Sequence, residues 1–346
     1  MNSSSEINLS SSPHSFPKAN TTHTMLFVII ALLPLCAKGV FLYGLSAFLV
    51  IFTSVVSCVI SEALFQLVTK RRIRVKDGSA IVTGLLLALV CPPTVPLWQV
   101  VLGGVFAIVV AKEFFGGIGA NVFNPALAGR AFMFVSFPTN MGATWLTPAK
   151  ASAINYVEAT SAATSAATGA VTSVATSEPV VDAISSSTLL SRIGEAELTT
   201  QNYWDFFFGN RAGCIGESSI LLILIAFVFL SVTRIIDWKT PLTMVATVAI
   251  ATLIAGGDVL MSVMAGGLLF GAVFMITDYA TTPVTMWGRI IFAFGCGLIT
   301  FLIRQFGGYP EGVMFSILIM NAVAPFLNRF VPRKYGYGKE KKAGKK

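Results

Sequence analysis

Long apolar segments separated by short polar ones dominate the pattern of this 346-residue chain. A helix of about 20 apolar residues crosses a hydrocarbon core of about 30 Å. The bilayer offers no water to unpaired backbone groups, and these runs are too continuous for barrel strands, so helices are expected. The pattern predicts an all-α polytopic membrane protein with about ten transmembrane helices. The expected spans cover residues 25–39, 41–68, 79–95, 97–112, 122–138, 219–236, 240–256, 258–277, 286–303 and 312–331.

One long polar segment, residues 139–218, divides the apolar runs into two sets of five. The expected organisation is a five-helix half over 25–138, a loop over 139–218 and a second five-helix half over 219–331. Polar tails flank it at 1–24 and 332–346. Two halves of five spans make an inverted or parallel repeat conceivable, although the halves share no evident sequence similarity. The first tail lacks the basic start of a secretory signal, so the first run is expected to remain as a span.

The distribution of charge predicts the orientation. The chain is 55% hydrophobic and 12% charged, whereas about a quarter of the residues in soluble domains are charged. Lys and Arg gather at 69–77 and 329–346, and the second of these holds eight of them against one Glu, while 233–239 and 286–289 are basic or near a basic residue. Residues 139–218 have the opposite bias, with three Lys or Arg against seven Asp or Glu. Basic loops stay in the cytoplasm, so both termini are expected inside and the long loop outside. The net charge of +8 then reflects a membrane anchor, and no nucleic-acid partner is expected.

The cysteines and histidines argue against several metal cofactors. The five cysteines form no CxxC pair, so the chain lacks a four-thiolate set of its own for iron–sulfur or zinc. His14 and His23 both precede the first span, which argues against haem ligation within the bilayer. No metal site is therefore predicted.

One stretch of the outer loop, "DAISSSTLL", combines an acidic residue with a run of hydroxyls. Asp182 precedes Thr188 by six residues, and no competing threonine of the "TSAAT" and "TSVAT" repeats has such an Asp. A hydroxyl in an accessible segment can enter a modifying enzyme, and the acidic neighbour offers a recognition point. The alternative is a Ser- and Thr-rich linker that only spans distance.

Here the chain resembles the RnfD/NqrB family, whose members carry FMN on a threonine in a motif of the form Asp-x-x-Ser/Thr-Gly/Ser-Ala-Thr-x-Leu. Asp182, Ser185, Ser186 and Thr188 match, whereas Ser187 stands where Ala is usual. The resemblance extends through five further motifs in family order. These are "DGSAIVTGLLLALVCPPTVPLW" (77–98), "AKEFFGGIGANVFNPALAGRAF" (111–132), "FFFGNRAGCIGESS" (206–219), "MITDYATTPVTMWGRIIF" (275–292) and "IRQFGGYPEGVMFSILIMN" (303–321).

The resemblance implies a membrane subunit of a redox-driven pump, inactive alone, in a prokaryotic inner membrane. FMN joined by a phosphoester to Thr188 would relay electrons between ferredoxin and NAD, coupled to Na⁺ or H⁺ translocation. The implied partners are a neighbouring protein with its own covalent FMN, iron–sulfur subunits and a flavin transferase for maturation. A second, noncovalent flavin such as riboflavin, or a quinone, is implied at the inner side.

The residues themselves offer places for these groups. Asn121 and Asn124, beside Gly117 and Gly119, put two amides near a glycine-exposed backbone, which suits the edge of a flat heteroaromatic ring. Glycines and a proline that merely turn the chain are the alternative.

At the other end of the loop, Gly213, Gly216 and Glu217 are candidates for a flavin-cradling turn. Acidic residues at membrane depth are functional candidates by default, and Glu62 and Asp278 are assigned to an ion path on this ground. Glu113 is a third ion-path candidate, with a solvated charge at a helix end as its alternative.

Three other functions remain open. An NqrB-type subunit of a sodium-pumping NADH:quinone reductase shares the motifs but usually has a longer N-terminal tail. A secondary transporter would also show ten spans with broken helices and would bind no flavin. A passive scaffold would use the outer loop as a spacer. Covalent flavin fluorescence on a denaturing gel separates the flavoproteins from the other two classes.

Overall fold

The computed structural model describes residues 21–71, 77–142, 204, 207–209, 213–307 and 311–328, and every regular element in these ranges is a helix. The first set is α1 (Thr21–Tyr43), α2 (Leu45–Val68), α3 (Ser79–Leu89), α4 (Leu97–Val105), η2 (Phe106–Glu113), α5 (Pro125–Ser136) and α6 (Pro138–Gly142). The second set is η3 (Ile215–Glu217), α11 (Ile220–Val232), α12 (Lys239–Ile254), α13 (Val259–Met264), α14 (Leu268–Phe270), η4 (Gly271–Met275), α15 (Met286–Phe306) and α16 (Val313–Leu327). The predicted all-helical class is confirmed for the described residues.

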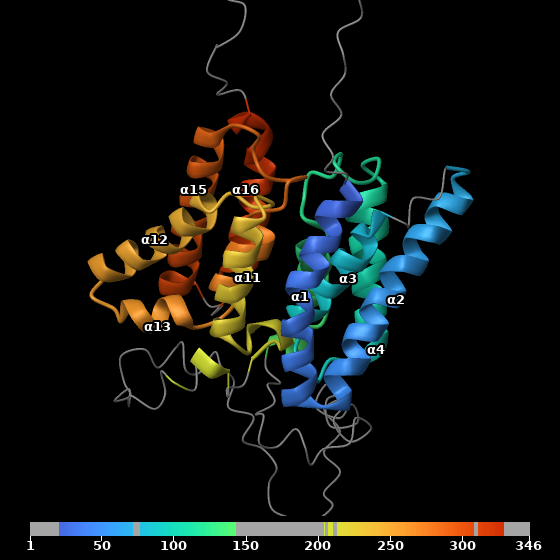
Figure 1. Ribbon diagram of the computed structural model, residues 1–346, viewed down its shortest axis with the longest axis horizontal. Coiled ribbons are helices and arrows are strands. Elements are labelled where there is room, and N and C mark those ends of the chain that lie inside the picture. Colours follow the sequence, from blue (N-terminus) through green and yellow to red (C-terminus); the bar gives the residue numbers. More distant parts are fainter. Residues whose placement is uncertain are drawn as a thin grey trace, which may run out of the picture.

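The two sets form two groups of helices that lie side by side (Figure 1). The helices from α1 to α6 make one group and those from α11 to α16 the other, with α1 in contact with α11 between them. The point where α1 begins and the point where α16 ends lie at the same, upper end of Figure 1, and α11 begins at the opposite end. This arrangement agrees with an even number of crossings, which is what the charge pattern requires.

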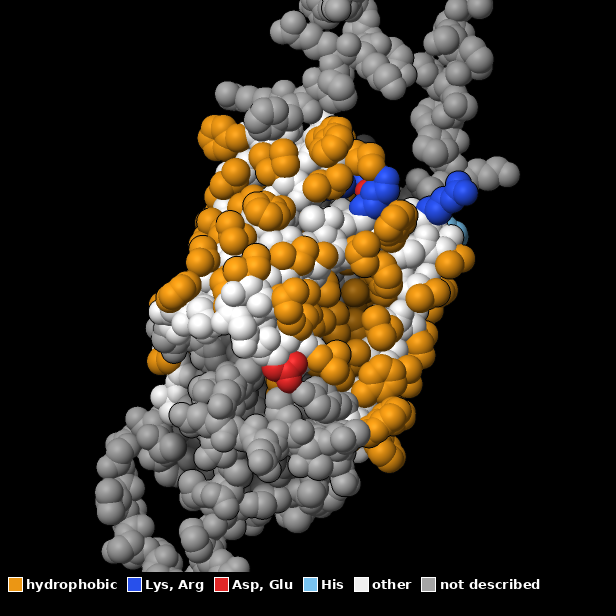
Figure 2. All heavy atoms as spheres, turned by 90° about the vertical axis from the view of Figure 1, so that its left-hand side faces the viewer, with side chains coloured by type: hydrophobic (Ala, Val, Ile, Leu, Met, Phe, Trp, Pro, Cys, Tyr) orange, Lys and Arg blue, Asp and Glu red, His pale blue; other side chains and the backbone are white. Residues whose placement is uncertain are grey.

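Among the described residues, three helices are long and apolar enough to cross a membrane by themselves: α1, α2 and α15. The helices α3, α11, α12 and α16 are also apolar but shorter, at 10–17 residues. The surface fits a bilayer, because the face turned to the viewer in Figure 2 is covered by hydrophobic side chains, with Lys and Arg gathered at its upper end. Large exposed apolar residues on α11, α12 and α15 belong to this kind of surface, among them Val232, Leu253, Ile254 and Phe306. The chain is thus built for an apolar environment, and the number of crossings remains a prediction.

Several expected spans are broken into pieces. The run 79–95 forms a helix only to Leu89, after which Val90–Pro96 continues as largely buried irregular chain. Pro92 and Pro93 cause this end, because proline lacks an N–H and disfavours helix in the residue before it. The run 258–277 is divided into α13, α14 and η4.

Small residues allow helices to approach closely in both groups. A Cβ added to Gly84 on α3 would lie 2.7 Å from the Cα of Val55 on α2. A Cβ on Gly297 of α15 would lie 2.8 Å from the carbonyl oxygen of Met244 on α12. Such contacts are typical of helix packing in lipid, where no hydrophobic effect drives helices together.

Candidate functional site

The two groups of helices share one structural device, a π-helix that ends in an irregular segment. η2 continues α4 and leads into residues 114–124, and η4 continues α14 and leads into residues 276–285. Each segment ends at a side-chain cap: Asn124 Oδ1 accepts from the backbone N–H groups of Ala126 and Leu127, and Thr285 Oγ1 accepts from that of Gly288. π-Helical turns occur frequently at functional sites. The duplicated device therefore marks a place to look for one.

The two irregular segments meet at a cavity of about 460 Å³ between the helix groups, here called the interhalf cavity. Its volume lies within the range of small-molecule and cofactor sites, about 300–1,000 Å³. Apolar side chains supply much of the wall, and amides, hydroxyls and charges supply the rest. The lining includes Met25, Val28, Ser79, Val82, Thr83, Leu86, Lys112, Ile118, Asn121, Asn124, Leu230, Arg234, Phe274, Thr277, Asp278 and Tyr279.

The structure brings three of the predicted site residues, Asn121, Asn124 and Asp278, into this one wall. The Nδ2 of Asn124 donates to the Oδ2 of Asp278 at 3.5 Å, which joins the two irregular segments across 154 residues of sequence. Asp278 also accepts from the Ala280 N–H at 3.2 Å and the Thr281 hydroxyl at 3.3 Å. An acidic group expected on an ion path is thus tied to an amide expected at a flavin.

The two asparagine amides are partly used by the protein itself. Asn121 Oδ1 accepts from the Gly119 N–H at 3.2 Å, and its Nδ2 donates to the Phe123 carbonyl at 3.1 Å. The side-chain oxygen of Asn124 is used in the N-terminal cap of α5. Gly117 and Gly119 have φ angles of 94° and 87°, which favour glycine, so this segment is shaped by its turns. The predicted contact of these amides with a ring stays a prediction, and each keeps an N–H that no described partner takes.

A second cavity, of about 420 Å³ and here called the carboxylate cavity, lies beside the first. Ile118 lines both. The predicted ion-path residues Glu62 and Glu113 line the second cavity together with Asp77 and Gly117. Its full lining is Glu62, Gln66, Arg71, Asp77, Glu113, Gly116, Gly117 and Ile118.

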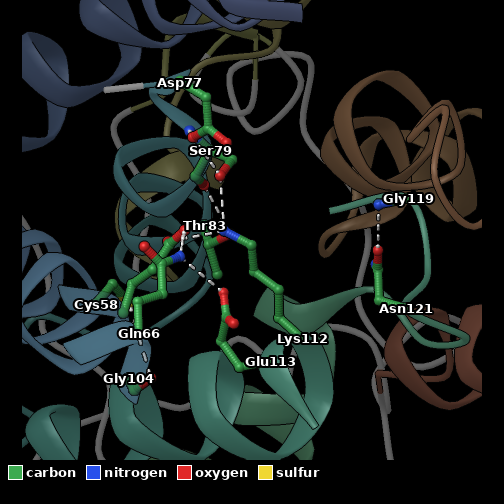
Figure 3. A network of polar contacts seen from close by, with 11 residues as sticks. Cys58, Gln66, Asp77, Ser79, Thr83, Gly104, Lys112, Glu113, Gly119 and Asn121 are labelled. Carbon is green, nitrogen blue, oxygen red and sulfur yellow. Dashed lines mark hydrogen bonds and ion pairs between the residues drawn. The ribbon is translucent and has the colours of Figure 1, made fainter. Parts of the chain in front are cut away.

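Glu62 is only 1% exposed and accepts from Lys112 Nζ at 2.8 Å in an ion pair that links α2 to η2. Glu113 is 3% exposed and accepts from Gln66 Nε2 at 3.2 Å. The alternative of a solvated charge for Glu113 is therefore wrong. Figure 3 shows Lys112 reaching into this network between Ser79 and Gln66.

The predicted turn at 213–217 lies at the opposite end, where α11 begins (Figure 1). Gly213 offers its carbonyl to the Tyr43 hydroxyl at 3.5 Å. Gly216 packs so closely against Leu89 that a side chain has no room, because an added Cβ would lie 2.7 Å from the Cβ of Leu89. Glu217 is buried, with a carboxylate oxygen against Gly267. A flavin contact at these residues remains a prediction.

Two buried charged residues inside expected spans were missed as candidates. Lys112 closes the run 97–112, and Arg130 lies within the run 122–138, where it pairs with Glu311 and contacts the Cys214 sulfur at 3.6 Å. A cation inside an apolar run is itself a signal of function or pairing, and this signal could have found both.

The proposed attachment site lies outside the described residues, namely Thr188 with Asp182, Ser185 and Ser186.

Comparison with known proteins places the chain in a family. It is 41% identical over 98% of its length to the D subunit of the Na⁺-translocating ferredoxin:NAD⁺ oxidoreductase complex of Acetobacterium woodii, covering 99% of that protein. It is 40% identical over 95% of its length to the D subunit of the proton-translocating ferredoxin:NAD⁺ oxidoreductase complex of Clostridium ljungdahlii, covering 96% of it. With the D subunit of the ion-translocating oxidoreductase complex of Stutzerimonas stutzeri the identity is 37% over 92% of this chain and 93% of the relative. The sequence profile of the NQR2, RnfD, RnfE family matches residues 8–336. The chain therefore belongs to the NQR2, RnfD, RnfE family.

Proposed function

We propose that this chain is the D subunit of an ion-translocating ferredoxin:NAD⁺ oxidoreductase complex of a bacterial inner membrane. The observation that carries the proposal is the nearly full-length similarity to relatives with this name, at about 40% identity. Within the complex the chain would hold FMN on Thr188 and a second, noncovalent flavin in the interhalf cavity. The relatives are named for either sodium or proton translocation, so the coupling ion stays open.

The interhalf cavity fits a flavin by size and by wall chemistry. A volume of about 460 Å³ accommodates a ligand of this class, and apolar side chains such as Val82, Leu86 and Phe274 can flank a flat ring. The spare N–H groups of Asn121 and Asn124 can donate to the ring's oxygen and nitrogen acceptors. A bound flavin would supply one- and two-electron chemistry, while the protein binds it, orients it and sets its electrostatics.

The acidic residues Glu62, Glu113 and Asp278 are proposed to serve the ion path. All three line one of the two cavities, Asp278 the interhalf cavity and Glu62 and Glu113 the carboxylate cavity. Buried carboxylates in a membrane protein mark ion and proton pathways because they are costly to place there. Their positions next to the proposed flavin would let charge movement and electron movement influence each other.

Filling the interhalf cavity is expected to displace the noncovalent flavin. Val28→Trp on α1 adds a large ring to the cavity wall, so the purified complex should lose most of its extractable riboflavin or FMN while its covalent flavin stays. Val228→Trp on α11 is the matched control, because Val228 is 58% exposed and does not line the cavity. Substitution of Asn124 is less informative, since it would also remove the α5 cap. Stoichiometric extractable flavin in the Val28→Trp complex would place the second flavin elsewhere.

The topology is tested by reporter fusions. A reporter after Lys346 is expected to report the cytoplasm and one inserted near Thr168 the outer side, because the basic clusters and the acidic loop require opposite sides. Alkaline phosphatase and green fluorescent protein, each active on one side only, make the measurement. Both sites on one side would overturn the ten-span arrangement.

A further inference from the structure

We propose that Lys112 is a positioning residue whose ammonium sets the reduction potential of the ligand in the interhalf cavity, and that Glu62 opposes it from the carboxylate cavity. The inference deepens the proposed function and rests on a flavin occupying the interhalf cavity. It concerns the pair as an electrostatic element between two cavities, a role distinct from ion conduction.

Lys112 stands at the boundary between the two cavities. It lies near the end of η2, is 2% exposed and lines the interhalf cavity, while its ion-pair partner Glu62 lines only the carboxylate cavity. The Nζ donates to Glu62 Oε2 at 2.8 Å and to Ser79 Oγ at 2.6 Å. An ammonium has three N–H donors, so one of them has no described partner and is available to a bound ligand.

The network continues on the acidic side. The hydroxyl of Ser79 donates to Asp77 Oδ1 at 2.7 Å, and Gln66 Nε2 bridges Glu62 at 3.1 Å and Glu113 at 3.2 Å. In Figure 3, the side chains of Ser79, Gln66 and Glu113 surround the end of the Lys112 side chain. Three carboxylates thus gather around one buried ammonium, and the lysine that carries it lines the interhalf cavity.

This arrangement has an electrostatic consequence for a redox ligand. Each electron that enters the ligand brings one negative charge, and a buried ammonium stabilises that charge more strongly than one in water would. The pair also has a direction, because its positive residue lines the interhalf cavity and its negative residue lines the carboxylate cavity. Asp278 and the more exposed Arg234 also line the interhalf cavity, but Lys112 is the buried cation among its described lining residues.

The test is a redox titration of the noncovalent flavin in the intact purified complex, followed by its visible absorbance. Lys112→Met should shift the midpoint potential to more negative values, and Glu62→Gln should shift it to more positive values. The expected size is at least tenfold in the reduction equilibrium constant, which is about 59 mV for a one-electron couple. Lys112→Arg should keep the midpoint potential near that of the wild type. The double variant Lys112→Met with Glu62→Gln should have a midpoint potential between those of the two single variants.

Lys239→Met is the matched control, because Lys239 begins α12 and lines neither cavity. It should leave the potential unchanged. If the Lys112–Glu62 ion pair only holds α2 against η2, the variants should change assembly or flavin content without shifting the midpoint potential in opposite directions. If Lys112→Met prevents assembly, Glu62→Gln and Lys112→Arg still decide the matter, since both preserve the shape of the network.

The outcomes separate this inference from the function on which it rests. Wild-type complex without extractable flavin would overturn the second flavin and this inference together. Wild-type complex with that flavin, but with unshifted potentials or shifts of the same sign in Lys112→Met and Glu62→Gln, would overturn this inference alone.

Discussion

Replacing Thr188 with valine is expected to abolish covalent flavin labelling of the chain. Valine keeps the β-branched shape and removes the oxygen that a phosphoester requires, so insertion and assembly should continue while attachment stops. The covalent band seen under ultraviolet light on a denaturing gel should vanish. Ferredoxin:NAD⁺ electron transfer by the complex should fall to background with it, because an electron relay fails when one carrier is missing.

Neighbouring substitutions provide the controls. Ser185→Ala and Thr176→Val should leave labelling largely intact, since neither oxygen is the proposed attachment point. Asp182→Ala should impair labelling by weakening recognition by the flavin transferase. The mass of the wild-type peptide spanning residues 180–192 decides the assignment. An unmodified peptide at full occupancy, or an adduct on Thr176, would contradict it.

Hydropathy alone predicted the helical class and the longest helices. The runs 41–68 and 286–303 correspond closely to α2 and α15, because an uninterrupted apolar sequence without internal proline has no alternative to a helix in lipid. The same runs cannot reveal how a helix is subdivided. The chain over 79–95 is apolar throughout, yet its helix ends at Leu89 since Pro92 and Pro93 follow.

The π-helices were beyond the reach of the sequence pattern. η2 and η4 differ from α-helix only in their hydrogen-bond register, and Phe106–Glu113 and Gly271–Met275 have no composition that distinguishes the two registers. They place the irregular segments 114–124 and 276–285 at one cavity. The sequence could name the turn residues in each segment and could not show that the segments meet.

In the candidate site, too, the sequence predicted single residues but not the contacts between them. Asn124 was recognisable as an amide beside exposed glycines, and Glu62 and Asp278 were recognisable as acidic residues at membrane depth, which are costly and therefore informative. Their partners were not, since Asn124 and Asp278 are 154 residues apart and Lys112 and Glu62 are 50 apart. Only a packed structure supplies such pairings. The proposed attachment site is the reverse case, because it rests on a local motif that lies outside the described residues.

Replacing Arg130 with methionine is expected to destabilise the protein far more than removing an exposed charge. Arg130 lies on α5 with a side chain 6% exposed, pairs through Nη2 with Glu311 and lies 3.6 Å from the Cys214 sulfur. It thereby joins the first helix group to the segment between α15 and α16 and to the chain before η3. The Glu311 side chain is 21% exposed, so removing its buried partner leaves a partly solvated carboxylate uncompensated, at a cost near the lower end of the about 3–5 kcal/mol typical of fully buried pairs. The midpoint of thermal unfolding in detergent should fall, and less chain should be recovered in the complex.

A second ion pair in the same chain provides the comparison. Arg289 lies 3.6 Å from Asp237, with side chains 37% and 28% exposed, so water already solvates both charges. Arg289→Met should therefore cost less than about 1 kcal/mol. The double variant Arg130→Met with Glu311→Gln should recover part of the loss, because it removes the stranded carboxylate while keeping its shape. If Arg130→Met unfolds at the same temperature as Arg289→Met, the buried pair does not hold the two helix groups together, and the stability of this end must come from the apolar packing of Leu89, Phe270 and Gly216 instead.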